Sequence, residues 1–502
     1  MVLPGIALLA AAAVGIVLRT WQLDAVGFNS DEAVYAGQAA AIAAVPELRD
    51  IFPIFRAHPL LFQYVLAIGE LFGADEVRAR LISVAVGMLT VGIGFLLGRL
   101  LYGTRVGVFA ALFMALMPYH VVVTRQVLLD GPMTLFATLA LYLVAKFADT
   151  GRPAFLYAAG ASLGLTFLAK ETGIILLGGV YVFLALSPEI KVRLRDLALS
   201  IVVMVLVIAP FPLSLSLAGG DGTSKAGSYL IWQLFRRANH DWIFYPETVP
   251  VAIGFGVVLA GILGLLLMRR WIAWQEKLLI TWVVVPIAFF QLWPVKGFQY
   301  LLPLCVPFAV LAAFAICEVF PLTIWKGLSR PWIRNQALPL LLGVVLASSL
   351  ALASWYRVQA AVSGEFLAGS GGVPGGREAG TWVRDNVPVG ATLMTIGPSM
   401  ANIIQFYGHR PAFGLSVSPN PLHRNPSYEP INNPDLEIRS GELQYIVWDS
   451  FSAARSTFFG TRIKEYAERY HGRVVHTESI TVPTEAGEEA SIPIIVIYEV
   501  RP

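Results

Sequence analysis

Long apolar runs recur along most of this chain, and they constrain its fold more than any other feature. Crossing a hydrocarbon core of about 30 Å takes roughly 20 helical residues, and only a helix satisfies its own backbone hydrogen bonds in lipid. Eleven runs approach that length, near residues 2–19, 81–101, 106–123, 131–148, 154–170, 173–188, 197–217, 249–268, 278–293, 300–320 and 337–355. With 56% hydrophobic and 14% charged residues, the chain is predicted to be an α-helical polytopic membrane protein with about eleven transmembrane helices.

The composition changes to that of a soluble domain at about residue 356. Strand patterns near 392–396, 445–448 and 492–500 alternate with helical patterns near 377–386, 399–407 and 460–471, which is typical of an α/β layer. We therefore predict a transmembrane domain over 1–356, a glycine-rich linker over 357–376 and a soluble, extracytoplasmic α/β domain over 377–502.

Two long outer loops, 21–80 and 218–248, interrupt the transmembrane domain. The first contains an apolar, aromatic segment at 59–68, about half a membrane thick, which is predicted to lie in the membrane interface. The second begins with Gly219, Gly220 and Gly222 and continues with aromatic and basic residues. That order predicts a lid, in which a mobile stretch precedes an interfacial anchor.

Basic residues are distributed unevenly between the short loops. With the N-terminus placed in the cytoplasm, five inner connections hold thirteen basic residues and three short outer connections hold one each. The inner residues are Arg99, Arg105, Lys146, Arg152, Lys191, Arg193, Arg195, Arg269, Arg270, Lys277, Lys326, Arg330 and Arg334. Because cytoplasmic loops carry the excess of Lys and Arg, we predict a multi-pass cell-membrane protein with a cytoplasmic N-terminus. Its active site and C-terminal domain are then extracytoplasmic.

Two adjacent carboxylates, Asp31 and Glu32, lie between the first and second apolar runs. Ionisable side chains within a turn of a membrane span are expensive, so this pair is a functional-site hypothesis. A helix cap is the alternative, because Asn29-Ser30-Asp31-Glu32 has the residue types that begin a helix, and the two interpretations are compatible. A carboxylate held there beside lipid is well placed as a general base, and partial burial would raise its pKa toward neutral pH.

The basic residues of the three short outer connections are Arg125, Lys170 and Lys296. Each of them alone could be an interfacial anchor whose stem lies in lipid. Together, on the same face as Asp31, they predict a site for a phosphate head group whose lipid tail stays in the bilayer. Asp130 and Tyr300 lie near them in the sequence, and both are predicted to support this site together with His58 of the first outer loop.

Several other side chains give weaker indications of function. His58 and the pair His240–Asp241 lie in the two long outer loops and could hold a divalent metal ion, but no spacing enforces a metal site. Hydrogen-bonded loop histidines are the simpler interpretation. Cys305 and Cys317 share one apolar run, which indicates neither a disulfide framework nor a metal knuckle. A net charge of +3 is too small to indicate a nucleic-acid partner.

An ordered set of motifs covers roughly residues 1–320. The set comprises Asp31-Glu32, His58-Pro59-Leu60, Thr124-Arg125-Gln126-Val127-Leu128-Leu129-Asp130, Leu168-Ala169-Lys170-Glu171 and Lys296 to Pro303. It resembles the protein O-mannosyltransferase family and, equally, its bacterial relative that adds aminoarabinose to lipid A, both of the GT-C glycosyltransferase superfamily. The β-trefoil insert of the eukaryotic enzymes has no counterpart here, so a protein acceptor is not specifically indicated.

The resemblance implies roles for particular residues. Asp31 matches the catalytic acidic residue of the family, Glu32 its neighbour that helps to place the acceptor, and Arg125 an arginine that contacts the lipid phosphate. Asp130 follows in the same motif, while Lys170, Lys296 and His240 are looser candidates. Some relatives hold a metal near the site and others do not, so the resemblance leaves a divalent metal open.

The resemblance implies an integral membrane inverting glycosyltransferase, either a hexosyl- or a pentosyltransferase. Its donor is a sugar on a polyprenyl phosphate of the dolichyl or undecaprenyl type, and its acceptor is a hydroxyl of a protein, lipid or glycan. A lipid phosphate is a leaving group that needs no proton donor, but it needs cations that stabilise the charge developing on it. One base together with several Lys and Arg residues is therefore sufficient for the reaction. The alternatives are a flippase of lipid-linked sugars and a GT-C ligase or polymerase that uses a lipid diphosphate. Transporters place polar groups near the bilayer midplane in repeated halves, whereas these charges gather at one surface.

Overall fold

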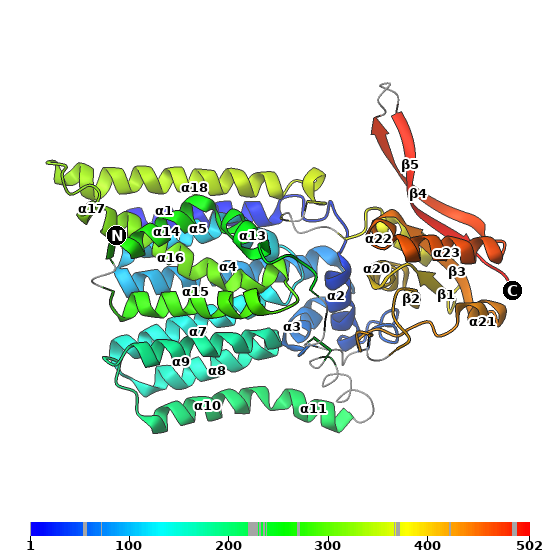
Figure 1. Cartoon of the computed structure of the whole chain (residues 1–502), viewed down its shortest axis with the longest axis horizontal. Coiled ribbons are helices and arrows are strands. Elements are labelled where there is room, and N and C mark those ends of the chain that lie inside the picture. Colours follow the sequence, from blue (N-terminus) through cyan, green and yellow to red (C-terminus); the bar gives the residue numbers. More distant parts are fainter. Residues whose placement is uncertain are drawn as a thin grey trace.

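The computed structural model describes residues 2–53, 58–71, 73–218, 229, 232–233, 236, 238–268, 272–365, 367, 372–420, 423–483 and 489–502. These residues form a bundle of long helices with a small α/β domain at one end (Figure 1). Several residues used in the sequence predictions lie outside the described residues: Gly219, Gly220, Gly222, Phe235 and Arg237 of the predicted lid, Arg269 and Arg270 of an inner loop, and Gly371 of the linker.

All eleven predicted apolar runs are helical. They correspond to α1 (Val2–Thr20), α4 (Glu76–Tyr102), α5 (Thr104–Leu116) with α6 (Pro118–Thr124), α7 (Asp130–Thr150), α8 (Pro153–Ala169), α9 (Ile175–Leu186), α10 (Leu194–Ile208) with α11 (Pro210–Ala218), α13 (Phe244–Ile253) with α14 (Phe255–Met268), α15 (Trp274–Leu292), α16 (Cys305–Phe314) with α17 (Phe320–Leu322), and α18 (Leu338–Arg357). A 3₁₀ turn, Glu171–Ile174, precedes α9, and another, Phe298–Leu304, precedes α16.

The number of complete spans depends on how bent helices are counted. Among the described residues, six helices are long and apolar enough to cross a membrane. The number rises to eight when two bent pairs each count as one span: α5 with α6, bent by 58°, and α13 with α14, bent by 99°. The remaining three predicted runs form shorter apolar helices, at Gly5–Thr20, Pro153–Ala169 and Glu171–Leu186. Breaks at Pro118 and at Gly254, whose φ is +102°, explain the two bent pairs.

Burial distinguishes the centre of the bundle from its rim. In Phe298–Leu322, which contains α16, 94% of the most apolar stretch is buried inside the protein. In Leu194–Leu217, which contains α10 and α11, only 11% is buried. A helix that is hydrophobic all round is buried or faces lipid, so α16 is the central helix and α10–α11 is the lipid-facing edge.

The first predicted outer loop, 21–80, contains two short helices, α2 (Ser30–Ile42) and α3 (Leu61–Glu70). Both lie at the end of the bundle that faces the α/β domain (Figure 1). Every residue of α2 from Glu32 to Ala41 is buried, so this helix is wrapped by protein. The predicted interfacial segment at 59–68 largely forms α3, which at ten residues is too short to cross the bilayer.

The C-terminal domain contains a five-stranded sheet with the order β2-β1-β3-β5-β4. Its strands are β1 (Thr392–Thr395), β2 (Ala412–Gly414), β3 (Leu443–Asp449), β4 (Arg473–Pro483) and β5 (Glu489–Glu499), and its helices are α19 (Gly376–Asn386), α20 (Pro398–Gly408), α21 (Pro434–Arg439), α22 (Ser450–Arg455) and α23 (Thr457–Arg469). Strands β2, β1 and β3 are parallel, while β5 is antiparallel to both of its neighbours. The predicted α/β layer and its three strands are thus confirmed.

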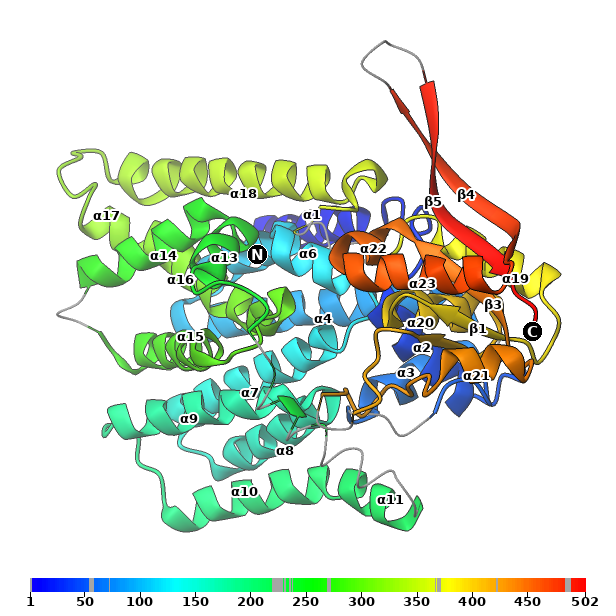
Figure 2. The ribbon, with the colours of Figure 1, turned by 45° about the vertical axis from the view of Figure 1, so that its right-hand side comes forward.

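Two strands were not predicted, for different reasons. Strand β2 has only three residues, too few to show a period. Strand β4 is rich in polar residues and is largely exposed, because it lies at the sheet edge and continues with β5 into a hairpin that projects from the domain (Figure 2).

The C-terminal domain contacts the bundle directly at the start of α2. The Tyr407 hydroxyl of α20 accepts a hydrogen bond from the backbone N–H of Phe28 at 2.7 Å and donates one to Glu76 of α4. Glu76 also pairs with Arg377 of α19 at 2.7 Å. The rings of Phe28 and Phe406 lie 5.0 Å apart. The residues just before Asp31 are therefore held between the bundle and the α/β domain.

Candidate functional site

The first turn of α2 is closed by a capping box. Asn29 Oδ1 accepts hydrogen bonds from the backbone N–H groups of Asp31 and Glu32, both at 3.0 Å. The backbone N–H of Asn29 donates to Glu32 Oε2 at 3.1 Å. The helix cap considered from the sequence is therefore present. Because the side chains of Asn29 and Glu32 make it, the Asp31 carboxylate is not part of the cap.

Glu32 is fully buried and is held by Arg80, the fifth residue of α4. Arg80 Nε donates to Glu32 Oε1 and Arg80 Nη2 to Glu32 Oε2, both at 2.9 Å. The backbone N–H of Val127 also donates to Glu32 Oε1, at 3.0 Å. Arg80 Nη1 donates to the carbonyls of Leu23 and Val26, both at 2.7 Å. Glu32 therefore joins α2, α4 and the segment after α6, and fixes the direction in which the neighbouring Asp31 points.

Asp31 lines a cavity of about 410 Å³, called here the Asp31 cavity. Its other polar lining includes His58, Lys170, Glu171, Arg236 and Tyr300. The Asp31 side chain is solvent-accessible through this space, yet the protein around it displaces bulk water. That burial raises the pKa of the Asp31 carboxyl, and the positive charges of Lys170 and His58 oppose part of the rise. A carboxyl with a raised pKa in a cavity is a general-base candidate.

Two ion pairs form part of the wall of the Asp31 cavity. Lys170 Nζ lies 2.8 Å from both carboxylate oxygens of Asp130, and both side chains are buried. The Lys170 ammonium also lies 4.9 Å from the centre of the Tyr300 ring. The second pair joins His58 Nδ1 to Glu171 Oε2 at 2.8 Å. Asp130 and Glu171 thus each have a partner, whereas Arg236 contributes a cation that contacts the Trp232 ring at 4.6 Å and Gln233 Oε1 at 3.2 Å.

A second cavity, of about 480 Å³, also has Asp31 in its lining and is called the Arg455 cavity. It is bounded by Gln126 and Phe298 of the bundle and by Tyr428 and Arg455 of the C-terminal domain. Gln126 Oε1 accepts a hydrogen bond from Asn29 Nδ2 at 3.0 Å, which links this wall to the cap of α2. Asp31 therefore lies between two spaces that are large enough for different ligands.

The structure brings together some of the predicted site residues. Asp31, His58, Lys170 and Tyr300 line one cavity, and Asp130 holds Lys170. Arg125 has other partners: its guanidinium donates to the carbonyls of Trp21, Gln22 and Val358 at 2.5, 3.3 and 3.1 Å. Arg125 and Glu32 line neither the Asp31 cavity nor the Arg455 cavity. The donor-binding role of Arg125 and the acceptor-placing role of Glu32 stay predictions.

Lys296, His240 and Asp241 line neither the Asp31 cavity nor the Arg455 cavity. The Lys296 ammonium lies 5.7 Å from the centre of the Trp242 ring, and its backbone N–H donates to Asn239 Oδ1 at 2.8 Å. The His240 ring stacks on Phe244 with 4.0 Å between centres. Partial burial and the charge of Lys296 lower the pKa of His240, which favours a neutral imidazole.

Among the described residues, no group of three or more His, Cys, Asp and Glu side chains is placed to hold a metal ion. Near Asp31 the carboxylates of Asp130 and Glu171 are already engaged by Lys170 and His58. The metal site left open for His240 and Asp241 remains a prediction, and no chemical step below uses it.

Many residues that line these cavities were not among the predicted site residues. Arg236 and Tyr229 lie in the aromatic, basic part of the predicted lid, where the sequence indicated an anchor. Arg455 comes from the soluble domain, and no local pattern connects it with Asp31. Arg80 directly precedes the second predicted span, at the outer end of that span. It is therefore another basic residue on the outer side, but it lies in the long loop 21–80 and was not counted with the short loops.

Comparisons with known proteins agree with this architecture. Residues 57–214 match the family model of the dolichyl-phosphate-mannose-protein mannosyltransferases. No curated protein matches the sequence. The crystal structure of ArnT from Cupriavidus metallidurans bound to undecaprenyl phosphate is similar, with a TM-score of 0.73 at 15% identity over 97% of each chain. Archaeal oligosaccharyltransferase AglB from Archaeoglobus fulgidus, in complex with an inhibitory peptide and a dolichol-phosphate, gives a TM-score of 0.65 at 14% identity over 97% of this chain and 74% of that one.

These matches confirm the resemblance inferred from the motifs. The similarity to ArnT extends over the bundle and the C-terminal domain, since it covers nearly the whole length of both chains. The family model covers α3 to α11 and includes Arg125, Asp130 and Lys170. The chain is therefore a multi-pass membrane protein with the GT-C fold of these similar structures, and its residues 57–214 match the family model of the dolichyl-phosphate-mannose-protein mannosyltransferases.

Proposed function

We propose that this protein is an inverting glycosyltransferase that transfers a sugar from a polyprenyl phosphate to a hydroxyl group of an acceptor. The observation that carries the proposal is the position of Asp31. Its carboxylate lies outside the helix cap, has a raised pKa and lines two cavities at the end of a membrane bundle. A single base between two substrate spaces fits a reaction that joins a donor and an acceptor.

Asp31 is the general base in this mechanism. Its carboxylate takes the proton of the acceptor hydroxyl while the hydroxyl oxygen attacks the anomeric carbon of the donor sugar. The bond between that carbon and the phosphate oxygen breaks, and the phosphate leaves with the electron pair. Attack from the face opposite the leaving group inverts the anomeric carbon.

The leaving phosphate needs positive charge where its own charge develops. Lys170 and Arg236 line the Asp31 cavity and supply N–H donors there. Asp130 balances much of the charge of Lys170 but also fixes the position of its ammonium. Tyr300 and Tyr229 add hydroxyl groups to the same wall. We therefore place the sugar phosphate in the Asp31 cavity and its polyprenyl chain in the surrounding bilayer.

The similar structures support a polyprenyl phosphate donor. The ArnT structure contains undecaprenyl phosphate, and the AglB structure contains dolichol-phosphate. The excess of basic residues in the inner loops supports an extracytoplasmic site in the cell membrane. The acceptor is a hydroxyl-bearing protein, lipid or glycan.

The test is turnover by the Asp31→Asn variant in lipid nanodiscs. Labelled undecaprenyl-phosphate hexoses and pentoses serve as donors, and mass spectrometry identifies the product. Removal of the base should reduce turnover by about 10²–10⁴-fold and leave undecaprenyl phosphate binding intact. The matched control is Asp385→Asn, on the exposed surface of α19 with its side chain 58% accessible. Near-normal turnover of Asp31→Asn, or movement of donor across liposomes without any product, would contradict the proposal.

A further inference from the structure

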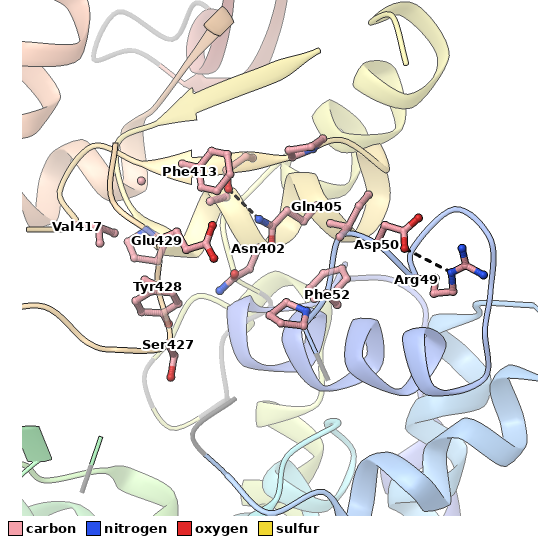
Figure 3. A pocket seen from close by; sticks show the side chains of 17 residues that line it. Arg49, Asp50, Phe52, Asn402, Gln405, Phe413, Val417, Ser427, Tyr428 and Glu429 are labelled. Carbon is pink, nitrogen blue, oxygen red and sulfur yellow. Dashed lines mark hydrogen bonds and ion pairs between the residues drawn. The ribbon is translucent and has the colours of Figure 1, made fainter. Parts of the chain in front are cut away.

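A third cavity lies between the bundle and the C-terminal domain, and neither the mechanism above nor the sequence predictions use it. It has a volume of about 420 Å³ and is bounded by the segment 49–53 after α2 and by α20, β2 and the segment 427–429 (Figure 3). We call it the Glu429 cavity. Its lining shares Ser427 and Tyr428 with the Asp31 cavity, and Tyr428 also lines the Arg455 cavity. All three spaces therefore meet at one tyrosine.

The polar groups of the Glu429 cavity are mostly amides and carboxylates. Gln405 Nε2 donates to the Ala412 carbonyl at 2.8 Å, and Asn402 Nδ2 donates to Ser30 Oγ at 2.9 Å, so both amides are held in fixed orientations. Figure 3 shows Glu429 and Asn402 on the same side of the cavity, close to Tyr428. Fixed donors and acceptors of this kind suit hydroxyl groups, which both donate and accept.

The charges of this cavity disfavour an anion. Its ionic lining consists of two carboxylates, Asp50 and Glu429, and one guanidinium, Arg49. Arg49 Nε lies 3.4 Å from Asp50 Oδ1, and the two side chains are 62% and 83% exposed. The positive charge is thus already balanced, and Glu429 contributes a further negative charge. A phosphate or carboxylate ligand would meet repulsion here, in contrast to the Asp31 cavity with Lys170 and Arg236.

Aromatic side chains form the remaining walls. Phe52, Phe413 and Tyr428 line the cavity with Pro53 and Pro398. Phe52 is almost fully buried because Gly37 of α2 lets the helix approach its ring: a Cβ atom at Gly37 would lie 2.5 Å from ring carbons of Phe52. The ring of Phe52 is therefore packed closely against α2. A cavity with apolar faces and a few fixed polar groups is the usual form of a small-ligand site.

We propose that the Glu429 cavity binds an uncharged saccharide as the acceptor and directs one of its hydroxyl groups past Ser427 and Tyr428 toward Asp31. This inference rests on the proposed glycosyltransferase function and names the acceptor class. Glu429 is a specificity-determining residue, because its carboxylate accepts hydrogen bonds from sugar hydroxyls and repels anionic acceptors. Tyr428 lines all three cavities, so its side chain positions the donor and the acceptor relative to Asp31.

The experiment measures saccharide binding separately from turnover. The full chain in nanodiscs is titrated with uncharged trisaccharides of gluco, manno and galacto configuration and with the same sugars carrying a phosphate, and saturation-transfer NMR detects binding. At least one uncharged sugar should bind more tightly than its phosphorylated form. Glu429→Ala should weaken that binding by about tenfold, and Glu429→Gln, which keeps one acceptor oxygen, should weaken it less. The matched control Glu442→Ala, on an exposed residue before β3, should bind like the original chain.

Binding of undecaprenyl phosphate provides the second measurement and should be unchanged in Glu429→Ala. In turnover assays this variant should raise the KM of the acceptor and leave the KM of the donor unaltered. The inference is overturned if Glu429→Ala binds uncharged sugars normally, or if phosphorylated sugars bind better than uncharged ones. If saccharide binding depends on Glu429 but no donor sugar is ever transferred, the proposed function fails while the saccharide site stands.

Discussion

The Glu32 carboxylate and the Arg80 guanidinium form a two-point ion pair, with both contacts at 2.9 Å and both side chains buried. Glu32 also belongs to the cap of α2 and accepts the N–H of Val127. The pair therefore supports the helix that carries Asp31 and links it to the segment after α6. Glu32 is the residue next to the proposed base, yet its contacts are those of a positioning group.

Arg80→Ala should destabilise the protein strongly. Removing one partner of a buried pair leaves an uncompensated charge, which typically costs about 3–5 kcal/mol in free energy of unfolding. Arg462→Ala is the control, because Arg462 pairs with Glu465 on the exposed face of α23 at 2.8 Å, and an exposed pair of this kind contributes little to stability. Thermal unfolding in the same detergent compares the two. Equal effects would mean that the Glu32–Arg80 pair is not structural.

The Lys170–Asp130 pair can be tested with a charge-neutral double variant. Lys170→Met and Asp130→Asn alone should each lower the melting temperature, since each strands a buried charge. The double variant Lys170→Met/Asp130→Asn should regain most of that stability, because no unpaired charge remains. Its donor affinity should stay low if Lys170 contacts the donor phosphate. Full recovery of donor KM together with stability would show that Lys170 only neutralises Asp130.

The raised pKa of Asp31 predicts the pH dependence of turnover. Asp31 acts as a base only when ionised, so the acid limb of kcat/KM should lie above about 3.9, the ordinary pKa of an aspartate. The contribution of Asp31 to the stability of the fold has the opposite pH dependence. A carboxyl whose pKa is raised by folding favours the folded state at low pH, and this contribution is lost as pH rises through the folded pKa. Asp31→Asn should therefore melt higher than the original chain at neutral pH and equally at strongly acid pH. An acid limb at the ordinary value, or no gain in melting temperature, would contradict the assignment.

Arg125 can be assigned by separating stability from donor affinity. Its guanidinium donates to three backbone carbonyls, of Trp21, Gln22 and Val358, so it joins the end of α1 to the end of α18. Arg125→Ala should lower the melting temperature, since three backbone carbonyls lose their donor, and should leave the KM of the donor within about twofold. Titration with undecaprenyl phosphate provides the direct measurement. A loss of donor affinity at unchanged melting temperature would instead confirm the donor-binding role that the family resemblance implies for Arg125.

The parts of the structure that could be predicted from the sequence are those that local patterns determine. All eleven apolar runs form helices because each run satisfies its own backbone hydrogen bonds, and Asp31 stands out in the sequence because a charge beside a span is rare. The bends at Pro118 and Gly254 do not interrupt the hydrophobic runs. The sequence therefore predicts the helices but not which of them form complete, straight spans. Arg455, Tyr428 and Glu429 belong to the C-terminal domain, whose helix α20 packs on α2. Such a contact between distant segments leaves no periodic signal in either one.

Tyr407 connects the C-terminal domain to the start of α2. The Tyr407 hydroxyl accepts from the N–H of Phe28 and donates to Glu76, so it ties the residues just before the capping box to both α20 and α4. Tyr407→Phe keeps the ring but leaves the Phe28 N–H without this acceptor, and the first turn of α2 should loosen. Because small displacements of a reacting group reduce rates by up to about 100-fold, kcat should fall while the KM of the donor changes little. Hydrogen exchange should increase at residues 28–32, and Tyr498→Phe on β5 should show neither effect. Normal exchange and normal kcat in Tyr407→Phe would mean that the α/β domain binds substrate but does not position Asp31.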